Sequence, residues 1–166
     1  SRTGQILSDA TGFERISPTR KNGGAHIVTA RRGRFGSGQL QEMFLHYDRP
    51  KIRVRAVFAQ HDTSAKDLIV ITTGSWTTIE HIMGLREEDY YKRIGAYYYN
   101  KGLDVVAFDH GSNGHIEALM NLAAIIEGGQ ILGVWARSIC DLIDHYGLRE
   151  KYERVVLYGL SRGGRV

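Results

Sequence analysis

The sequence predicts an α/β domain in which antiparallel strands come first and parallel strands with crossover helices follow. In the front part of the chain, residues 52–59 place four apolar side chains at alternate positions and two arginines between them, the pattern of a strand with one solvated face. Further on, three short apolar runs are typical of strands covered on both faces. Segments with helical spacing separate these runs. Strand, helix, strand, helix, strand in this order predicts right-handed crossovers and a parallel sheet.

Size and composition fit one domain, or most of one. The chain has 166 residues, of which 42% are hydrophobic and 24% charged, and this balance excludes wholesale disorder. No run reaches the roughly 18 apolar residues of a membrane-spanning helix, so no span is expected. A single cysteine, Cys140, excludes an intrachain disulfide framework. We find no signal-peptide pattern and leave the compartment open, with the cytoplasm slightly favoured.

Charge is distributed unevenly along the chain. Residues 1–66 contain 12 Lys and Arg residues against 5 Asp and Glu residues, whereas the whole chain has a net charge of +4. A basic front can bind nucleic acid or another anionic surface. The arginines are scattered and form no nucleic-acid motif, so we favour a solvated sheet that bears arginines and consider nucleic-acid binding unlikely.

The first expected elements are strands. Residues 1–24 are polar and rich in glycine, and we expect an irregular N-terminal extension; residues 25–166 are expected to form the front part of a single domain. Strands are predicted at residues 26–32, 40–47 and 52–59, with turns at residues 34–38 and 48–51.

The remaining elements alternate between strand and helix. The three apolar runs predict buried strands at residues 68–71, 105–108 and 155–158. Helices are predicted at residues 87–100, 116–127 and 130–146, of which the last has a clean amphipathic pattern. Gly102 and Gly147 are the expected stops of the first and last helix, and Gly128-Gly129 separates the second from the third.

The third apolar run leads directly into Gly-Leu-Ser-Arg-Gly-Gly at residues 159–164. This is the pattern G-x-S-x-G, in which a nucleophilic serine stands on a sharp turn between a strand and a helix. The glycines two residues before and after the serine avoid clashes in that turn. We therefore predict a nucleophile elbow with Ser161 as the nucleophile. The alternative is a tight glycine turn that merely contains a serine.

A second segment fits the same chemistry. Thr72-Thr73-Gly74-Ser75-Trp76 follows the first apolar run, where acyl transfer needs one backbone donor for the oxyanion. Gly74 lets the backbone turn, so the N–H of Ser75 or Trp76 is expected to pair with the N–H of Arg162 in an oxyanion hole. The alternative is an ordinary turn at the end of a strand.

At this point the sequence resembles the α/β-hydrolase family over residues 40–166. The resemblance rests on the order of the elements, the turn at residues 73–76, the loop at residues 109–114 and the elbow at residues 159–164. Thr73 stands where the family usually has His. Gly111 and Ser112 replace the Arg and Gly that the family often has in the next loop. The resemblance implies that the acid and the His of a catalytic triad follow after later strands, beyond residue 166.

The resemblance also implies that these residues are the N-terminal half of a domain, up to the nucleophile elbow. The protein continues past Val166, or it is cleaved near residues 163–165, or it is a genuine half-domain. We prefer the first, because a parallel strand at residues 155–158 without its next neighbour would expose an apolar edge.

Further polar residues are expected near the same edge of the sheet. Asp109 and His110 follow the second apolar run, on the side where such sheets bind ligands, and with Gly74 they are expected to line the pocket. A pair of His110 with Ser161 would break the family's chain order. The histidines show no metal-ligand spacing, and neither a phosphate loop nor a dinucleotide fingerprint is present, so we predict no metal and no cofactor.

Together these features predict a serine hydrolase, an esterase or acyl hydrolase, that forms an acyl-enzyme on Ser161. The expected partners are a small-molecule or acylated substrate and the remainder of the domain, in the same or a separate chain. The alternative is a non-catalytic, hydrolase-like module that binds another protein. A basic nucleic-acid binder is the weakest of the three hypotheses.

Overall fold

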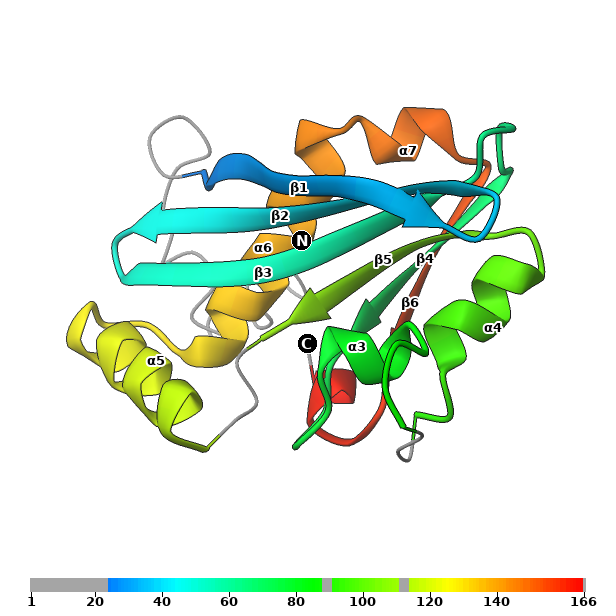
Figure 1. Ribbon diagram of the computed structural model, residues 1–166. Coiled ribbons are helices and arrows are strands. Elements are labelled where there is room, and N and C mark those ends of the chain that lie inside the picture. The colour runs from blue at the N-terminus through cyan, green and yellow to red at the C-terminus, as the bar shows by residue number, and fades with distance from the viewer. Residues whose placement is uncertain (1–23, 88–90, 111–113, 166) are drawn as a thin grey trace.

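A mixed six-stranded sheet forms the centre of the computed structural model, which describes residues 24–87, 91–110 and 114–165 (Figure 1). The strand order is β1-β2-β3-β5-β4-β6. The strands are β1 (His26–Phe35), β2 (Gly38–Asp48), β3 (Lys51–Gln60), β4 (Asp67–Thr72), β5 (Asp104–Asp109) and β6 (Arg154–Gly159). The first three are antiparallel, and β5 is antiparallel to β3. β4 is parallel to both β5 and β6, so the predicted order of antiparallel and then parallel strands is confirmed.

Helices cover both faces of this sheet. They are α3 (Ile79–Ile82), α4 (Ile94–Asn100), α5 (Gly114–Ile126), α6 (Ile131–His145) and α7 (Leu148–Lys151), followed by the 3₁₀ helix η1 (Ser161–Arg165). α6 packs on one face, and α3 and α4 pack on the other (Figure 1). The result is the three-layer arrangement that parallel strands require.

Two hydrophobic clusters show why β4 and β5 read as continuous apolar runs. Leu68 and Val70 of β4 point into the cluster that contains α6, whereas Ile69 and Ile71 point into the cluster that contains α3 and α4. Successive side chains of a strand face opposite sides, so a strand covered on both faces needs apolar residues at every position. The predicted buried strands at residues 68–71 and 105–108 are therefore confirmed.

The third predicted buried strand, at residues 155–158, is wrong in its burial. β6 is present, but it is the last strand of the sheet and β4 is its one neighbour. Val156 is 45% exposed and Leu157 is 61% exposed. No helix among the described residues covers these two side chains, so apolar composition here indicated a strand without indicating its cover.

The helix predicted at residues 87–100 begins later than the acidic residues suggested. α4 starts at Ile94, and both Lys92 and Arg93 have left-handed backbone angles, with φ of 48° and 56°. A left-handed residue interrupts an α-helix, so the helix cannot extend back through these positions. Residues 88–90 lie outside the described part of the chain. The predicted end near Asn100 is confirmed.

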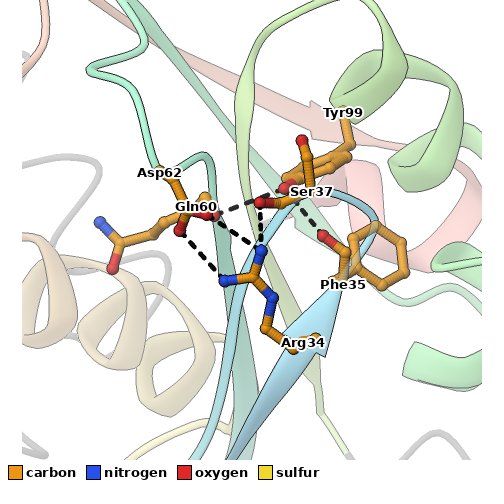
Figure 2. A network of polar contacts seen from close by, with 6 residues as sticks. All are labelled: Arg34, Phe35, Ser37, Gln60, Asp62 and Tyr99. Atoms are coloured by element: carbon orange, nitrogen blue, oxygen red, sulfur yellow. Dashed lines mark hydrogen bonds and ion pairs between the residues drawn. The ribbon is translucent and has the colours of Figure 1, made fainter.

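Hydrogen bonds and an ion pair fix the tip of the β1–β2 hairpin at the other edge of the sheet. The Tyr99 hydroxyl of α4 donates to the carbonyl of Phe35 at 2.9 Å, as Figure 2 shows. Arg34 binds Asp62 at 3.0 Å and also donates to the carbonyl of Ser37. Both strands of the hairpin extend further than predicted, and the turn narrows to residues 36–37.

Several of the described arginines of the basic front lie on the antiparallel strands and have local partners. Arg55 bridges Glu42 and Glu80 at 2.6 and 2.8 Å, and Arg31 also pairs with Glu42. Arg53 lies over the ring of Phe44, 4.6 Å from its centroid. These contacts are those of the arginine-bearing sheet surface favoured from the sequence.

Candidate active site

The carboxyl ends of β4, β5 and β6 meet at one edge of the sheet, because the three strands are parallel. At this edge β6 runs into residues 159–164, which we call the serine turn. Ser161 begins η1, is exposed, and has a left-handed φ of 57°. A non-glycine residue rarely adopts this conformation, and such strain is concentrated at functional sites. The serine hydroxyl is thus presented to solvent above a parallel sheet.

Glycines make this sharp turn possible. A Cβ atom on Gly159 would lie 2.1 Å from the carbonyl oxygen of Gly163, a distance that no side chain tolerates. A Cβ atom on Gly163 would in turn lie 2.7 Å from the carbonyl oxygen of Thr72. The spacing Gly-x-Ser-x-Gly therefore has a steric cause: the chain folds back on itself and against β4 at these two positions.

The serine turn is held directly against the end of β4. The buried Thr72 hydroxyl donates to the carbonyl of Gly163 at 2.6 Å. This contact brings the backbone just after Ser161 next to the loop of residues 73–78, which we call the β4 loop. Arg162, the predicted oxyanion donor of the turn, lies in the chain between Ser161 and the anchored Gly163. Its side chain is outside the described part of the structure.

The β4 loop contains the other predicted donors. Gly74 is buried, Ser75 is half-buried, and Trp76 is 75% exposed. The N–H of Thr77 donates to the carbonyl of Gly74 at 3.4 Å, which closes a turn over Ser75 and Trp76. Within this turn Trp76, rather than Gly74, has the left-handed backbone, with φ of 65°. A strained, exposed tryptophan in the β4 loop is a feature that spacing alone did not predict.

Asp109 and His110 occupy different environments at the end of β5. Asp109 is partly exposed. His110 is fully buried, and its ring stacks on Phe108 and on Trp135 with centroids 5.3 and 5.0 Å apart. Its main chain is tied to the β4 loop, because its N–H donates to the hydroxyl of Thr73 at 3.2 Å. This burial argues against direct contact between the ring and a ligand.

The protonation state of His110 follows from its partner Ser138. The single hydroxyl proton of Ser138 goes to the carbonyl of Trp135 at 2.7 Å, so its oxygen accepts from Nε2–H of His110 at 3.2 Å. Nδ1 is then the bare acceptor nitrogen, with no hydrogen-bond partner among the described residues. Burial lowers the pKa of His110 to about 3, because a second ring proton would have neither solvent nor an acceptor. His110 is thus neutral and engaged with Ser138.

Tyr91 is the residue of this site that sequence reasoning missed. It lies outside the regular elements, between α3 and α4, and it is 2% exposed. Its hydroxyl lies 2.7 Å from the carbonyl oxygen of Thr72 and 3.3 Å from the backbone nitrogen of Leu160. The helix predicted over residues 87–100 was expected to bury Tyr90 or Tyr91 together with Ile94 and Tyr98, but nothing in the spacing connected either tyrosine with the serine turn.

Other features of the described residues bear on binding. A cavity of about 230 Å³ lies beside the serine turn, lined among others by Thr72, Ile139 and Leu157.

Within the described ranges, no three His, Cys, Asp or Glu side chains are grouped to hold a metal ion. In the same ranges no single helix is long and apolar enough to cross a membrane, although α5 and α6 together pass that test as a pair bent by 94°.

Comparisons with known proteins show the fold. No protein-family model matches the sequence, and no curated protein matches it either. A solved structure assigned as an acetyl xylan esterase from Bacteroides fragilis superposes with a TM-score of 0.73 at 16% identity, over 97% of this chain. A cold-adapted esterase from an Arctic intertidal metagenomic library gives 0.52 at 19% identity over 82% of the chain. A glucuronoyl esterase from Solibacter usitatus gives 0.50 at 12% identity over 93%.

This chain has the α/β fold of these esterases. It spans about half the length of the structures that it matches: 46% of the first, 56% of the second and 51% of the third. The expected α/β class, with antiparallel strands before parallel ones, agrees with both the sheet and these neighbours. At 12 to 19% identity the likeness shows the fold alone.

Proposed function

We propose that this chain carries the nucleophile of a serine esterase and that Ser161 is that nucleophile. The observation that supports it best is the serine turn itself. An exposed serine with a left-handed backbone follows a parallel strand, and glycines allow close packing on either side. The structural neighbours with this fold are esterases, which supports the same reaction class here.

The proposed reaction is acyl transfer in two steps. The Ser161 oxygen attacks the carbonyl carbon of an ester, and its proton passes to a histidine that later returns it to the departing alcohol. Water then attacks the acyl-enzyme, releases the acid and restores the serine. The acid and the histidine of the triad are proposed to come from polypeptide beyond residue 166, since the one described histidine at the end of β5, His110, is buried and engaged with Ser138.

The oxyanion is proposed to bind between the serine turn and the β4 loop. The bond from Thr72 to Gly163 supports this, because it holds the two backbone segments in contact. The donors are the N–H of Arg162 and that of Ser75 or Trp76. Fixed donors aimed at the developing negative charge supply about 3 kcal/mol of transition-state stabilisation each in such enzymes.

The substrate class that we propose is an ester attached to a carbohydrate. Two of the structural neighbours are assigned as acetyl xylan and glucuronoyl esterases. In this chain, Trp76 presents an exposed indole in the β4 loop. A flat aromatic face suits a sugar ring, whose C–H groups give it an apolar side. Gly74 and Asp109 are proposed to line the same pocket, as expected from the sequence.

A second partner that we propose is the remainder of the domain. Exposed apolar side chains lie on β6, directly after it, and separately along α5: Val156, Leu157, Leu160, Ile116, Leu119, Leu122 and Ile126. A sheet edge with apolar faces on both sides favours pairing with a further strand and a covering helix. Because the chain spans about half the length of its structural neighbours, we propose that further polypeptide covers these apolar side chains.

The decisive experiment uses a fluorophosphonate probe on the complete protein. The probe reacts with activated serines, and labelling is expected at Ser161 in the wild type and nowhere in Ser161→Ala. Hydrolysis of p-nitrophenyl acetate is expected to fall at least about 1000-fold in Ser161→Ala with the circular dichroism spectrum unchanged. Full turnover in this variant would refute the proposal.

The alternative function is a non-catalytic module that binds another protein. Thr73 in place of the family's usual His favours it, as does the apolar surface of α5. An unlabelled Ser161 in a complete, folded protein would favour this alternative over the esterase.

A further inference from the structure

Two chain segments that are distant in sequence meet on one buried hydroxyl group at the proposed active site. Thr72 ends β4 and leads into the β4 loop, and Leu160 directly precedes Ser161. Tyr91 belongs to neither segment, but its hydroxyl contacts both. We propose that Tyr91 is a positioning residue, which fixes Ser161 relative to the oxyanion donors of the β4 loop. This inference rests on the proposed function.

This hydroxyl both donates and accepts a hydrogen bond. Its one proton is best placed on the carbonyl of Thr72, at 2.7 Å, since the carbonyl of Leu160 is farther away at 3.2 Å. Its oxygen accepts from the N–H of Leu160 at 3.3 Å. The hydroxyl therefore forms a bridge between the last residue of β4 and the residue before the nucleophile.

The bridge includes a backbone N–H that lies beyond the ladder between β4 and β6. The paired positions of these strands end at Thr72 and Gly159, so the N–H of Leu160 lies just beyond the last pair. Without the Tyr91 hydroxyl this N–H, whose bond to the tyrosine is partly buried although the Leu160 side chain is exposed, would have to find another acceptor, and an unmet backbone donor costs about 1–3 kcal/mol. The turn would relax to avoid that cost.

The side chain itself is held firmly, as a positioning role requires. Tyr91 is 2% exposed and packs edge to face on Tyr158 of β6, with ring centroids 6.3 Å apart. Together with the bond from Thr72 to Gly163, it anchors the serine turn on both sides of Ser161. These anchors hold the strained φ of 57° in place.

The expected consequence falls on the chemical step. A displacement of about 1 Å between a nucleophile and its oxyanion donors can reduce the rate on the order of 100-fold. Substrate binding in the ground state does not depend on that alignment. Loss of the Tyr91 hydroxyl should thus lower kcat and leave KM nearly unchanged.

The test compares Tyr91→Phe with Tyr97→Phe in the complete protein. Tyr97 lies in α4 and is 53% exposed, so its variant removes the same atom from the same region without touching the site. For p-nitrophenyl acetate we expect Tyr91→Phe to lower kcat about 10-fold with KM within about twofold, and Tyr97→Phe to match the wild type. Fluorophosphonate labelling of Ser161 should slow by a similar factor. Circular dichroism at the assay temperature checks that each variant is folded.

The outcomes separate this inference from the proposed function. A wild type that is not labelled at Ser161 contradicts the proposed function. A labelled wild type with Tyr91→Phe equal in kcat and labelling rate overturns only the positioning role. A rise in KM with unchanged kcat, or a loss of the folded spectrum in Tyr91→Phe, also overturns it, because the hydroxyl would then serve binding or folding.

Discussion

Single atoms decide whether the serine turn can form. Gly159 and Gly163 lie where a Cβ atom would meet backbone at 2.1 and 2.7 Å. The backbone is less able to move away than the end of a flexible side chain. These two glycines were recognised from the motif, and the structure supplies the contacts that make a larger residue unfavourable.

Gly163→Ala is expected to destabilise the fold by about 1–3 kcal/mol, because the new methyl group would be forced into Thr72. Gly33→Ala is the matched control, since a Cβ atom there would have nothing within 4 Å. Urea unfolding monitored by circular dichroism measures both variants. Equal urea midpoints for the two variants would show that the serine turn can accommodate a methyl group at position 163.

His110 should make the protein sensitive to acid. Its folded-state pKa is about 3, below the ordinary 6.5, so the unfolded state takes up a proton at a higher pH than the folded state. Stability should therefore fall by roughly 1 kcal/mol per pH unit as the pH drops from 6.5 toward 3.

His110→Gln tests this origin, because the glutamine amide can still donate to Ser138 but does not titrate. The variant should lose stability less steeply than the wild type between pH 6.5 and 4, measured as urea midpoints at a series of pH values. Parallel curves for the two proteins would assign the acid sensitivity to other groups.

At the level of elements, tyrosines from one short stretch hold three parts of the sheet together. Tyr99 of α4 caps the end of the β1–β2 hairpin, while Tyr91 contacts β4 and the serine turn. Sequence reasoning predicted this stretch as one continuous helix that buries aromatic residues. The left-handed residues Lys92 and Arg93 divide it, and that division points the two tyrosines to opposite ends of the strands.

Tyr99→Phe is expected to cost about 1 kcal/mol, because the carbonyl of Phe35 loses its donor (Figure 2). Tyr97→Phe, on the exposed side of the same helix, should stay within about 0.5 kcal/mol of the wild type. Chemical denaturation gives both values. Hydrogen exchange should also speed up in the amides near residues 36–37 if the hairpin tip depends on this bond.

At the scale of the whole molecule, the two edges of the sheet differ in kind. β1 forms one edge and carries three arginines among its ten residues, whereas β6 at the other edge begins with one arginine and continues with apolar residues. Val28 on β1 and Val156 on β6 have similar exposure, 40% and 45%. They make a matched pair for asking which edge is covered in the complete protein.

Val156→Asp is expected to destabilise the complete protein by more than about 2 kcal/mol, since a covered carboxylate would lose its hydration. Val28→Asp should change stability by less than about 0.5 kcal/mol. Thermal unfolding of both variants in the complete protein decides the matter. A tolerated Val156→Asp would mean that β6 remains an open edge.

The sequence by itself determined the order of strands and helices, the two strands buried on both faces and the location of the serine turn. Those features depend on local periodicity and on glycines at fixed spacing, which a reader of the chain can see. The tertiary structure decided the exposure of β6, the late start of α4, the burial of His110 and the hydrogen bonds of Tyr91. Each of these depends on which distant segments come into contact, and a hydroxyl 69 residues from its partner leaves no trace in local spacing.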